Sequence, residues 1–273
     1  MKSILVPMED YEAITGPLRA AKEFAQQHGS TVTGMALRAP RFQVVGAEPV
    51  VAVSFPVSEE DEEETLANAK NVFDGFVLNE AANANGANFV WNNEGPLDDV
   101  GLGSISRVFD LTVIGRPNSQ EGLPRMTTLE AALFDSGRPV LIIPPELQGG
   151  FGKNVVISWN CSTESSHTIA TALPILKNAE KVTVLTVPEA VVPGPSGAQL
   201  CDYLKHHSIN ADELTVPAGR RKAGAAILEE TAKLGGDLLV KGAYTQSRLR
   251  QMILGGATNY LLAHSKLPIF MEH

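Results

Sequence analysis

Two groups of glycines near the C-terminus have the arrangement of a loop that binds a phosphate group. Gly242 ends a short apolar run at residues 238–240, which is typical of a buried parallel strand. Gly255 and Gly256 follow after a polar loop and open a predicted last helix. Glycines let backbone N–H groups approach an anion, and a helix N-terminus adds the positive end of its dipole. Residues 237–258 therefore predict an anion site, although a glycine at a strand end is also typical of a simple turn.

Other reactive side chains give weaker signals. The adjacent pair at 206–207 consists of two histidines that point apart on a helix, and no cluster of Cys, His and carboxylates supports a metal there. Residues 165–167 contain serine and histidine, but they stand where a helix begins, and serine there is typical of a cap. Cys161 follows a strand end and is interpreted as a small structural residue rather than an oxidisable thiol. Arg248 and Arg250 fit either phosphate steering or a solvated helix face.

The most specific nucleotide motifs are missing from the sequence. The Gly152-Lys153 pair lacks the upstream glycine of a Walker A loop, and residues 101–106 lack the third glycine of a dinucleotide fingerprint. The acidic run at 59–64 is interpreted as the first turn of a helix rather than a metal site, because acidic side chains favour the helix dipole there. We therefore expect no metal and no catalytic residue. A slow ATPase is the remaining enzymatic alternative.

Composition and charge describe an ordinary globular protein. The 273 residues are 44% hydrophobic and 19% charged, with a net charge of −9. This charge argues against a nucleic-acid or membrane partner, since phosphate surfaces demand clustered Lys and Arg. No apolar run approaches the roughly 20 residues of a membrane span, and residues 1–7 enter a strand without a signal-peptide core. Cys161 and Cys201 are not in CxxC spacing, so we expect reduced thiols and a cytoplasmic location.

The first half of the chain alternates apolar runs with segments of helical period. Predicted strands lie at residues 4–7, 31–37, 89–91, 111–114 and 140–143, and helices at 18–28, 66–77, 100–109 and 129–133. Residues 38–58 contain several prolines and show no clear period. We interpret this segment as a surface excursion.

The same pattern begins again after a turn-rich linker. Predicted strands lie at residues 155–159, 181–187, 213–216, 238–240 and 267–271, with helices at 169–176, 200–206 and 225–234 before the last one. Residues 237–242 match 110–115, and residues 267–271 match 138–142, in the same order. Two repeats of about 130 residues predict two domains rather than a solenoid. We place them at residues 1–147 and 152–273.

Strands that alternate with helices predict an α/β fold, in which parallel sheets are covered on both faces. Ligands of such sheets bind beyond the carboxyl ends of the strands, where the strand order reverses. In the second half, Asn160 and Ser162 follow the first strand, Val187 follows the second, and Gly242 ends the fourth. These positions are the predicted binding edge.

The chain resembles the tandem universal stress proteins of bacterial type. The resemblance covers nearly the whole length, because each half resembles one domain of the family. Nucleotide-binding members carry a glycine, two residues, a glycine, nine residues, and then a glycine with Ser or Thr. Here Gly242 is followed by Thr245 in place of the second glycine, by residues 246–254, and by Gly255 as the third. Gly256 stands where Ser or Thr is usual.

The resemblance implies two tandem open parallel sheets, Rossmann-like and similar to the adenine nucleotide alpha hydrolases, each with strand order 3-2-1-4-5. It implies that the second domain binds ATP or another adenine nucleotide, and that no cofactor is obligatory. It also implies that the protein is a stress-response sensor or regulator. The acidic residue of the family near the adenosine corresponds to Asn160. The implied nucleotide-binding residues are Ser158, Asn160, Val187, Lys241, Gly242, Thr245, Gly255, Gly256, Ala257 and Thr258.

The first half departs further from the family motif. After Gly115 come Arg116, Pro117 and Asn118, and no Gly-Gly or Gly-Ser pair follows. The resemblance therefore implies that the first domain is a structural partner in an intramolecular pseudo-dimer, in which residues 140–143 and 268–271 face each other. Because Thr245 and Gly256 both depart from the motif, a scaffold with an unknown protein partner and no nucleotide is the alternative function. A homodimer of the whole chain stays open.

Overall fold

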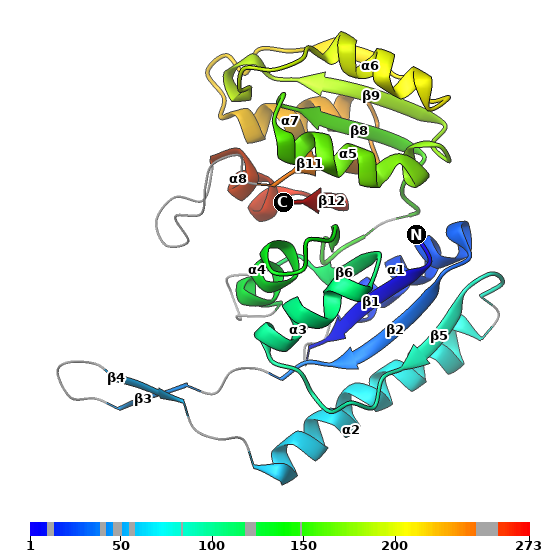
Figure 1. Cartoon of the computed structure of the whole chain (residues 1–273), viewed down its shortest axis with the longest axis vertical. Helices are drawn as coiled ribbons and strands as arrows, with labels where there is room; N and C mark the ends of the chain where they lie inside the picture. Colours follow the sequence, from blue (N-terminus) through cyan, green and yellow to red (C-terminus); the bar gives the residue numbers. More distant parts are fainter. Residues whose placement is uncertain are drawn as a thin grey trace.

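A single ten-stranded sheet runs through the protein (Figure 1). The structure is a computed structural model that describes residues 1–9, 14–38, 42–45, 51–54, 58–82, 84–117, 124–147, 149–243 and 256–273. The strand order is β10-β9-β8-β11-β12-β7-β6-β1-β2-β5. The second half of the chain therefore forms one end of the sheet and the first half forms the other.

The elements of the first half follow the predicted alternation closely. Its strands in the large sheet are β1 (Ser3–Met8), β2 (Thr31–Ala36), β5 (Asn88–Trp91), β6 (Leu111–Gly115) and β7 (Val140–Ile143). Its α-helices are α1 (Thr15–His28), α2 (Glu59–Phe76), α3 (Asp99–Ile105) and α4 (Met126–Phe134). Short π and 3-10 turns follow α2 (Val77–Ala81) and α3 (Ser106–Val108). The predicted surface excursion contains an antiparallel hairpin of β3 (Phe42–Val45) and β4 (Val51–Ser54).

The second half repeats this series without the hairpin. Its strands are β8 (Asn154–Trp159), β9 (Lys181–Thr186), β10 (Asp212–Thr215), β11 (Leu238–Gly242) and β12 (Ile269–Glu272). Its α-helices are α5 (Thr163–Leu176), α6 (Gly197–His206), α7 (Ala223–Lys233) and α8 (Gly256–His264), and a 3-10 turn (Pro188–Ala190) follows β9.

The strands of the large sheet keep the order 3-2-1-4-5 within each half, as predicted, when the β3–β4 hairpin is left aside. All pairs within a half are parallel, and the one between the halves is antiparallel, with Phe270 opposite Leu141. The predicted meeting of the two last strands is thus confirmed. The detail that differs is that the two sheets join into one. The boundaries at residues 147 and 152 stay predictions.

The acidic run at residues 59–64 forms the start of α2, as interpreted from the sequence. Ser58 caps this helix, because its side chain accepts a hydrogen bond from the backbone N–H of Asp61. Four acidic residues occupy the first turn, where their negative charge complements the helix dipole. The run therefore has a local structural role that requires no metal.

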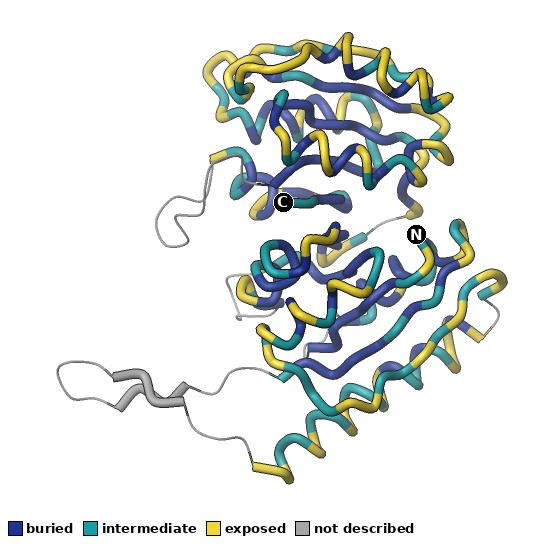
Figure 2. Tube along the Cα trace, viewed as in Figure 1, coloured by how far each residue is buried: buried dark blue, intermediate teal, exposed yellow. Residues whose placement is uncertain are grey.

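Two apolar cores cover the two faces of the sheet, and its central strands are buried along most of their length, whereas the edge strands β5 and β10 are partly exposed (Figure 2). One core lies under α1, α2, α5 and α6, and the other under α3, α4, α7 and α8. Leu141 and Phe270 belong to the first core, and Ile142 and Met271 to the second, so both cores continue across the β7–β12 pair. We call this pair and its side chains the seam. Burial of apolar area at the seam holds the two halves together.

Arg116 adds a polar link across the seam. Its Nη1 donates to the carbonyl oxygen of Leu262 at 3.0 Å and to that of Ala263, near the C-terminal end of α8. A cation at this end of a helix is favourable, because the last carbonyl groups have no partner inside the helix. No helix in the described part of the chain has the length and apolar character that crossing a membrane requires.

Candidate functional site

The carboxyl ends of β8, β9 and β11 lie at one edge of the sheet, because the three strands are parallel neighbours. The register pairs Val240 with Ile157, so Lys241 and Ser158 come next along their strands. Helices α5 and α8 both begin at this edge. The structure therefore brings the predicted residues of the first and fourth strands of this half to one place.

The turn between β8 and α5 is held by the side chain of Asn160. Its Oδ1 accepts from the backbone N–H of Ser162 at 3.3 Å and from the hydroxyl of Ser165. Ser162 in turn caps α5, accepting from the backbone N–H of Ser165 at 3.2 Å. Because Oδ1 is used inside the turn, the Nδ2 amide group is the part of Asn160 suited to donate to a ligand.

Cys161 occupies the tightest point of this turn. Its φ of 66° lies in the left-handed region, which few non-glycine residues adopt. Burial raises the pKa of its thiol, so less of the nucleophilic thiolate forms near neutral pH. This environment favours the structural interpretation of Cys161 over a reactive one.

Packing requires a glycine at position 242, which the loop motif did not suggest. A Cβ added there would lie 2.6 Å from the carbonyl carbon of Glu164 and 2.7 Å from the Cα of Ser165. Contacts this short to backbone atoms cannot be relieved by turning a side chain. The end of β11 therefore reaches the first turn of α5 only because residue 242 has no side chain.

Lys241 points to the opposite face of the sheet, between Leu239 and Ala243 of the core under α7 and α8. Only 7% of the residue is exposed. Its Nζ donates to the carbonyl oxygen of Gly242 at 2.7 Å and to Oγ1 of Thr258, in the first turn of α8, at 3.2 Å. Burial lowers the pKa of Lys241 to about 8, and the negative charge of Glu164 opposes this shift. A buried ammonium group thus lies at the N-terminal turn of a helix.

The remaining predicted residues divide into three groups. Gly256, Ala257 and Thr258 form the first turn of α8, as expected. Val187 is buried in the core under α7 and α8, so a ligand at this edge would meet its backbone rather than its side chain. Thr245 and Gly255 lie outside the described residues, and so do Arg248 and Arg250. The structure therefore gives no backbone conformation for Thr245.

The corresponding edge of the first half is occupied by an internal ion-pair network. Glu9 follows β1 as Asn160 follows β8, and its Oε1 accepts from Nε of Arg125 at 3.0 Å and from the hydroxyl of Thr128. The Nη1 and Nη2 groups of Arg125 bond both carboxylate oxygens of Asp99 at 2.9 and 2.8 Å. Burial raises the pKa of Glu9, while Thr128 and Arg125 oppose the rise. The guanidinium group of Arg125 thus links Glu9 and Asp99 at this edge of the first half.

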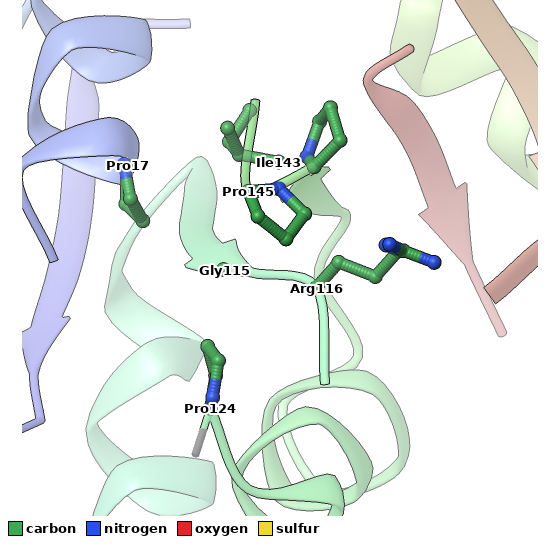
Figure 3. Close-up of a pocket in the computed structure, with 7 residues that line it drawn as sticks. Pro17, Gly115, Arg116, Pro124, Ile143 and Pro145 are labelled. Atoms are coloured by element: carbon green, nitrogen blue, oxygen red, sulfur yellow. The ribbon is translucent and has the colours of Figure 1, made fainter. Parts of the chain in front are cut away.

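The cavity beyond Gly115 is equally unsuited to a phosphate group. It measures about 20 Å³, which is room for roughly one water molecule. Figure 3 shows its lining, and shows Arg116 extending from it toward the second half. The lining residues are Pro17, Gly115, Arg116, Pro124, Ile143, Pro144 and Pro145. Since proline has no N–H, most of this lining offers no backbone donor to an anion.

The sequence did not reveal two of the residues that shape these two edges. Ser165 holds Asn160, and Arg125 pairs with Glu9 across the fold. The unusual position of Lys241 was visible in the sequence, because a lysine at the end of a run predicted to be buried is rare. The described residues contain no group of three His, Cys, Asp or Glu side chains that could hold a metal ion.

Comparison with known proteins supports the family resemblance. The model of the universal stress protein family matches residues 153–271. The fold of the whole chain is similar to the crystal structure of a universal stress protein from Archaeoglobus fulgidus DSM 4304, with 15% identity, a TM-score of 0.74, and coverage of 98% of this chain and 97% of that one.

It is also similar to a functionally unknown protein from Pseudomonas aeruginosa PAO1, with 13% identity, a TM-score of 0.55, and coverage of 100% of this chain and 92% of that one. At these identities the structural likeness shows the fold alone. A comparison with curated proteins gave no match. Residues 153–271 of this chain are therefore a domain of the universal stress protein family.

Proposed function

We propose that the chain is a tandem universal stress protein whose second half binds ATP or another adenine nucleotide. It would act as a cytosolic sensor or regulator of stress. The observation that carries this proposal is that one carboxyl edge of the sheet bears both the buried ammonium group of Lys241, at the first turn of α8, and the polar turn at Asn160. The phosphate chain of a nucleotide would be bound by the ammonium group and the helix N-terminus, and the nucleoside by the polar turn.

The difference between the corresponding edges of the two halves supports the same proposal. In the second half, the binding edge carries an amide, a hydroxyl, an ammonium and a helix N-terminus. In the first half, Arg125 is bonded to Glu9 and Asp99, and prolines line the adjoining cavity. We therefore propose one nucleotide site in each chain, with the first half as its fixed partner.

A scaffold function without nucleotide is the second candidate. It is favoured by Gly242, whose lack of a side chain is already explained by the contact with Ser165 and Glu164. The most motif-like glycine is thus no proof of a phosphate ligand. We propose no catalytic role for either candidate.

Calorimetric titration of the purified full chain with ATP tests the proposal, together with extraction of any nucleotide that copurifies. The site variant is Thr258→Val, which keeps the shape and removes the hydroxyl group that Lys241 contacts. Thr215→Val, at an exposed strand end, is the matched control. We expect binding that Thr258→Val weakens and Thr215→Val leaves unchanged. No extracted nucleotide and no heat at millimolar ATP would refute the proposal and favour the scaffold.

A further inference from the structure

In the described part of the chain, the buried ammonium group of Lys241 has no anionic hydrogen-bond partner. The two acceptors found there, the carbonyl of Gly242 and the hydroxyl of Thr258, are neutral. The ion pairs in the described part of the second half involve Lys153, Arg221 and Lys233 instead. Residues 244–255, which the structure does not describe, contain no Asp or Glu in their sequence. The loop that follows β11 therefore cannot supply a carboxylate either.

The carboxylates on the elements around Lys241 are engaged elsewhere or lie at a distance. Glu272, at the end of β12, accepts from the hydroxyl of Thr171 at 2.6 Å. Glu230 on α7 is paired with Lys233 and Arg221. Glu164 on α5 acts on Lys241 through its charge alone, and no hydrogen bond or ion pair joins the two in the described residues. The first turn of α8 carries no acidic residue.

A second positive charge lies at the same place. The first N–H groups of α8 have no acceptor inside the helix, and the helix dipole adds roughly half a positive charge at this end. Buried charges in proteins are normally paired, because an unpaired one loses its hydration without compensation. Lys241 and Thr258 are both buried, so the ammonium group and the N-terminal turn of α8 destabilise each other until an anion binds.

We infer that Lys241 makes this site selective for a ligand that ends in a dianionic phosphate group. Such ligands are phosphomonoesters, including the terminal phosphate of a nucleoside diphosphate. A cyclic nucleotide is a monoanionic diester and a nucleoside is neutral, so each compensates less of the positive charge. This inference rests on the proposed nucleotide site and names the class of ligand that it prefers.

Thr258 transmits the effect of the lysine to the ligand. Oγ1 of Thr258 accepts a hydrogen from Nζ of Lys241, and its own hydroxyl hydrogen, which has no acceptor among the described residues, can donate to a phosphate oxygen. A hydroxyl group that accepts from a cation is a stronger donor than an isolated one. Lys241 therefore acts both by its charge and through this polarised hydroxyl group.

Ligand binding should also draw in a proton. In the empty site, burial lowers the pKa of Lys241 to about 8, so near that pH a fraction of the molecules carry a neutral amine. A dianionic phosphate stabilises the charged form and raises the pKa again. At pH 8, therefore, binding of the dianion takes up part of a proton from the buffer.

The test is calorimetric titration of the full chain with ADP, cyclic AMP, adenosine and inorganic pyrophosphate, at pH 8, in two buffers of different ionisation enthalpy. The variants are Lys241→Met and Lys241→Gln, and the matched control is Lys181→Met, at an exposed lysine that begins β9. We expect each Lys241 variant to weaken ADP about tenfold or more, the effect of losing a charged donor. Adenosine should change less than about threefold, and the buffer-dependent heat should disappear.

Equal weakening of ADP and adenosine, or unchanged ADP binding, would overturn the inference while leaving nucleotide binding in place. The same holds if wild-type protein binds ADP with no buffer-dependent heat. Binding of pyrophosphate that depends on Lys241, without binding of any adenine compound, would refute the proposed function and support the charge selectivity. Failure of every ligand to bind the wild type would overturn both. Circular dichroism of each variant establishes that it is folded.

Discussion

Replacing Lys241 by methionine is expected to stabilise the protein in the absence of ligand, and to do so most at neutral pH. The cause is burial, which lowers the pKa of Lys241 from 10.5 to about 8. The charged form is therefore disfavoured in the folded state relative to the unfolded one. This penalty is fully present below pH 8 and is relieved as the pH rises from 8 to 10.5, since the folded protein then holds a neutral amine.

The size of the effect follows from that difference. At about 1.4 kcal/mol for each pH unit, the penalty amounts to about 3 kcal/mol at pH 7 and falls to about 1 kcal/mol at pH 10. Methionine also removes the hydrogen bonds to Gly242 and Thr258, at about 1 kcal/mol each. That loss is the same at both pH values. The change with pH in the difference between variant and wild type therefore isolates the ionisation.

Urea denaturation at pH 7 and pH 10 measures this change. Trp91 and Trp159 lie in different halves, so their fluorescence reports on both. We expect the unfolding free energy of Lys241→Met, relative to wild type, to fall by about 2 kcal/mol between the two pH values. Lys181→Met, at an exposed lysine, should show no such fall. A difference that stays constant from pH 7 to pH 10 would refute the assignment of a buried charge to Lys241.

Further substitutions test the packing and ion pairs described above. Gly242→Ala should destabilise the protein by about 3 kcal/mol through overpacking against α5. Gly256→Ala is the control, since no described atom lies within 4 Å of the added Cβ, and it should change stability by less than about 0.5 kcal/mol. Equal effects of the two variants in urea denaturation would contradict this reasoning. Arg125→Met should cost about 3–5 kcal/mol at pH 7, because Glu9 is left buried and unpaired. That loss should shrink as the pH falls and Glu9 takes up a proton, and adding Glu9→Gln should recover part of it. Arg116→Met should cost about 1–2 kcal/mol by removing its bonds to α8 across the seam, and an unchanged urea midpoint would argue against that link.

The strand order and the meeting of the last strands were predicted from the family resemblance, and the parallel strand–helix units were predicted from local pattern. Alternating apolar runs and helical segments specify parallel units, and the family resemblance supplied their order. The reason for Gly242 was not predictable, because it depends on the first turn of α5, which is distant in sequence. The ion pairs of Arg125 were missed for the same reason, since Glu9 and Asp99 come from other elements.

The positions of the candidate site residues were predicted better than the environments of their side chains. Asn160 and Thr258 lie where the topology required. Val187 reaches the edge, but its side chain is committed to the core. Lys241 was chosen for its place in the motif, and its distinguishing property, a buried charge with neutral partners, could emerge only from three-dimensional contacts.

The seam between β7 and β12 also bears on how the protein responds to dilution. Two separate chains that paired along such strands would come apart at low concentration, and their response to a ligand would depend on how much protein was present. Here a short linker between β7 and β8 joins the two halves, so the two surfaces of the seam are at a high effective concentration of each other. The pairing of the halves is therefore unimolecular. Occupancy of a site in the second half would then follow the concentration of the ligand alone, at any abundance of the protein.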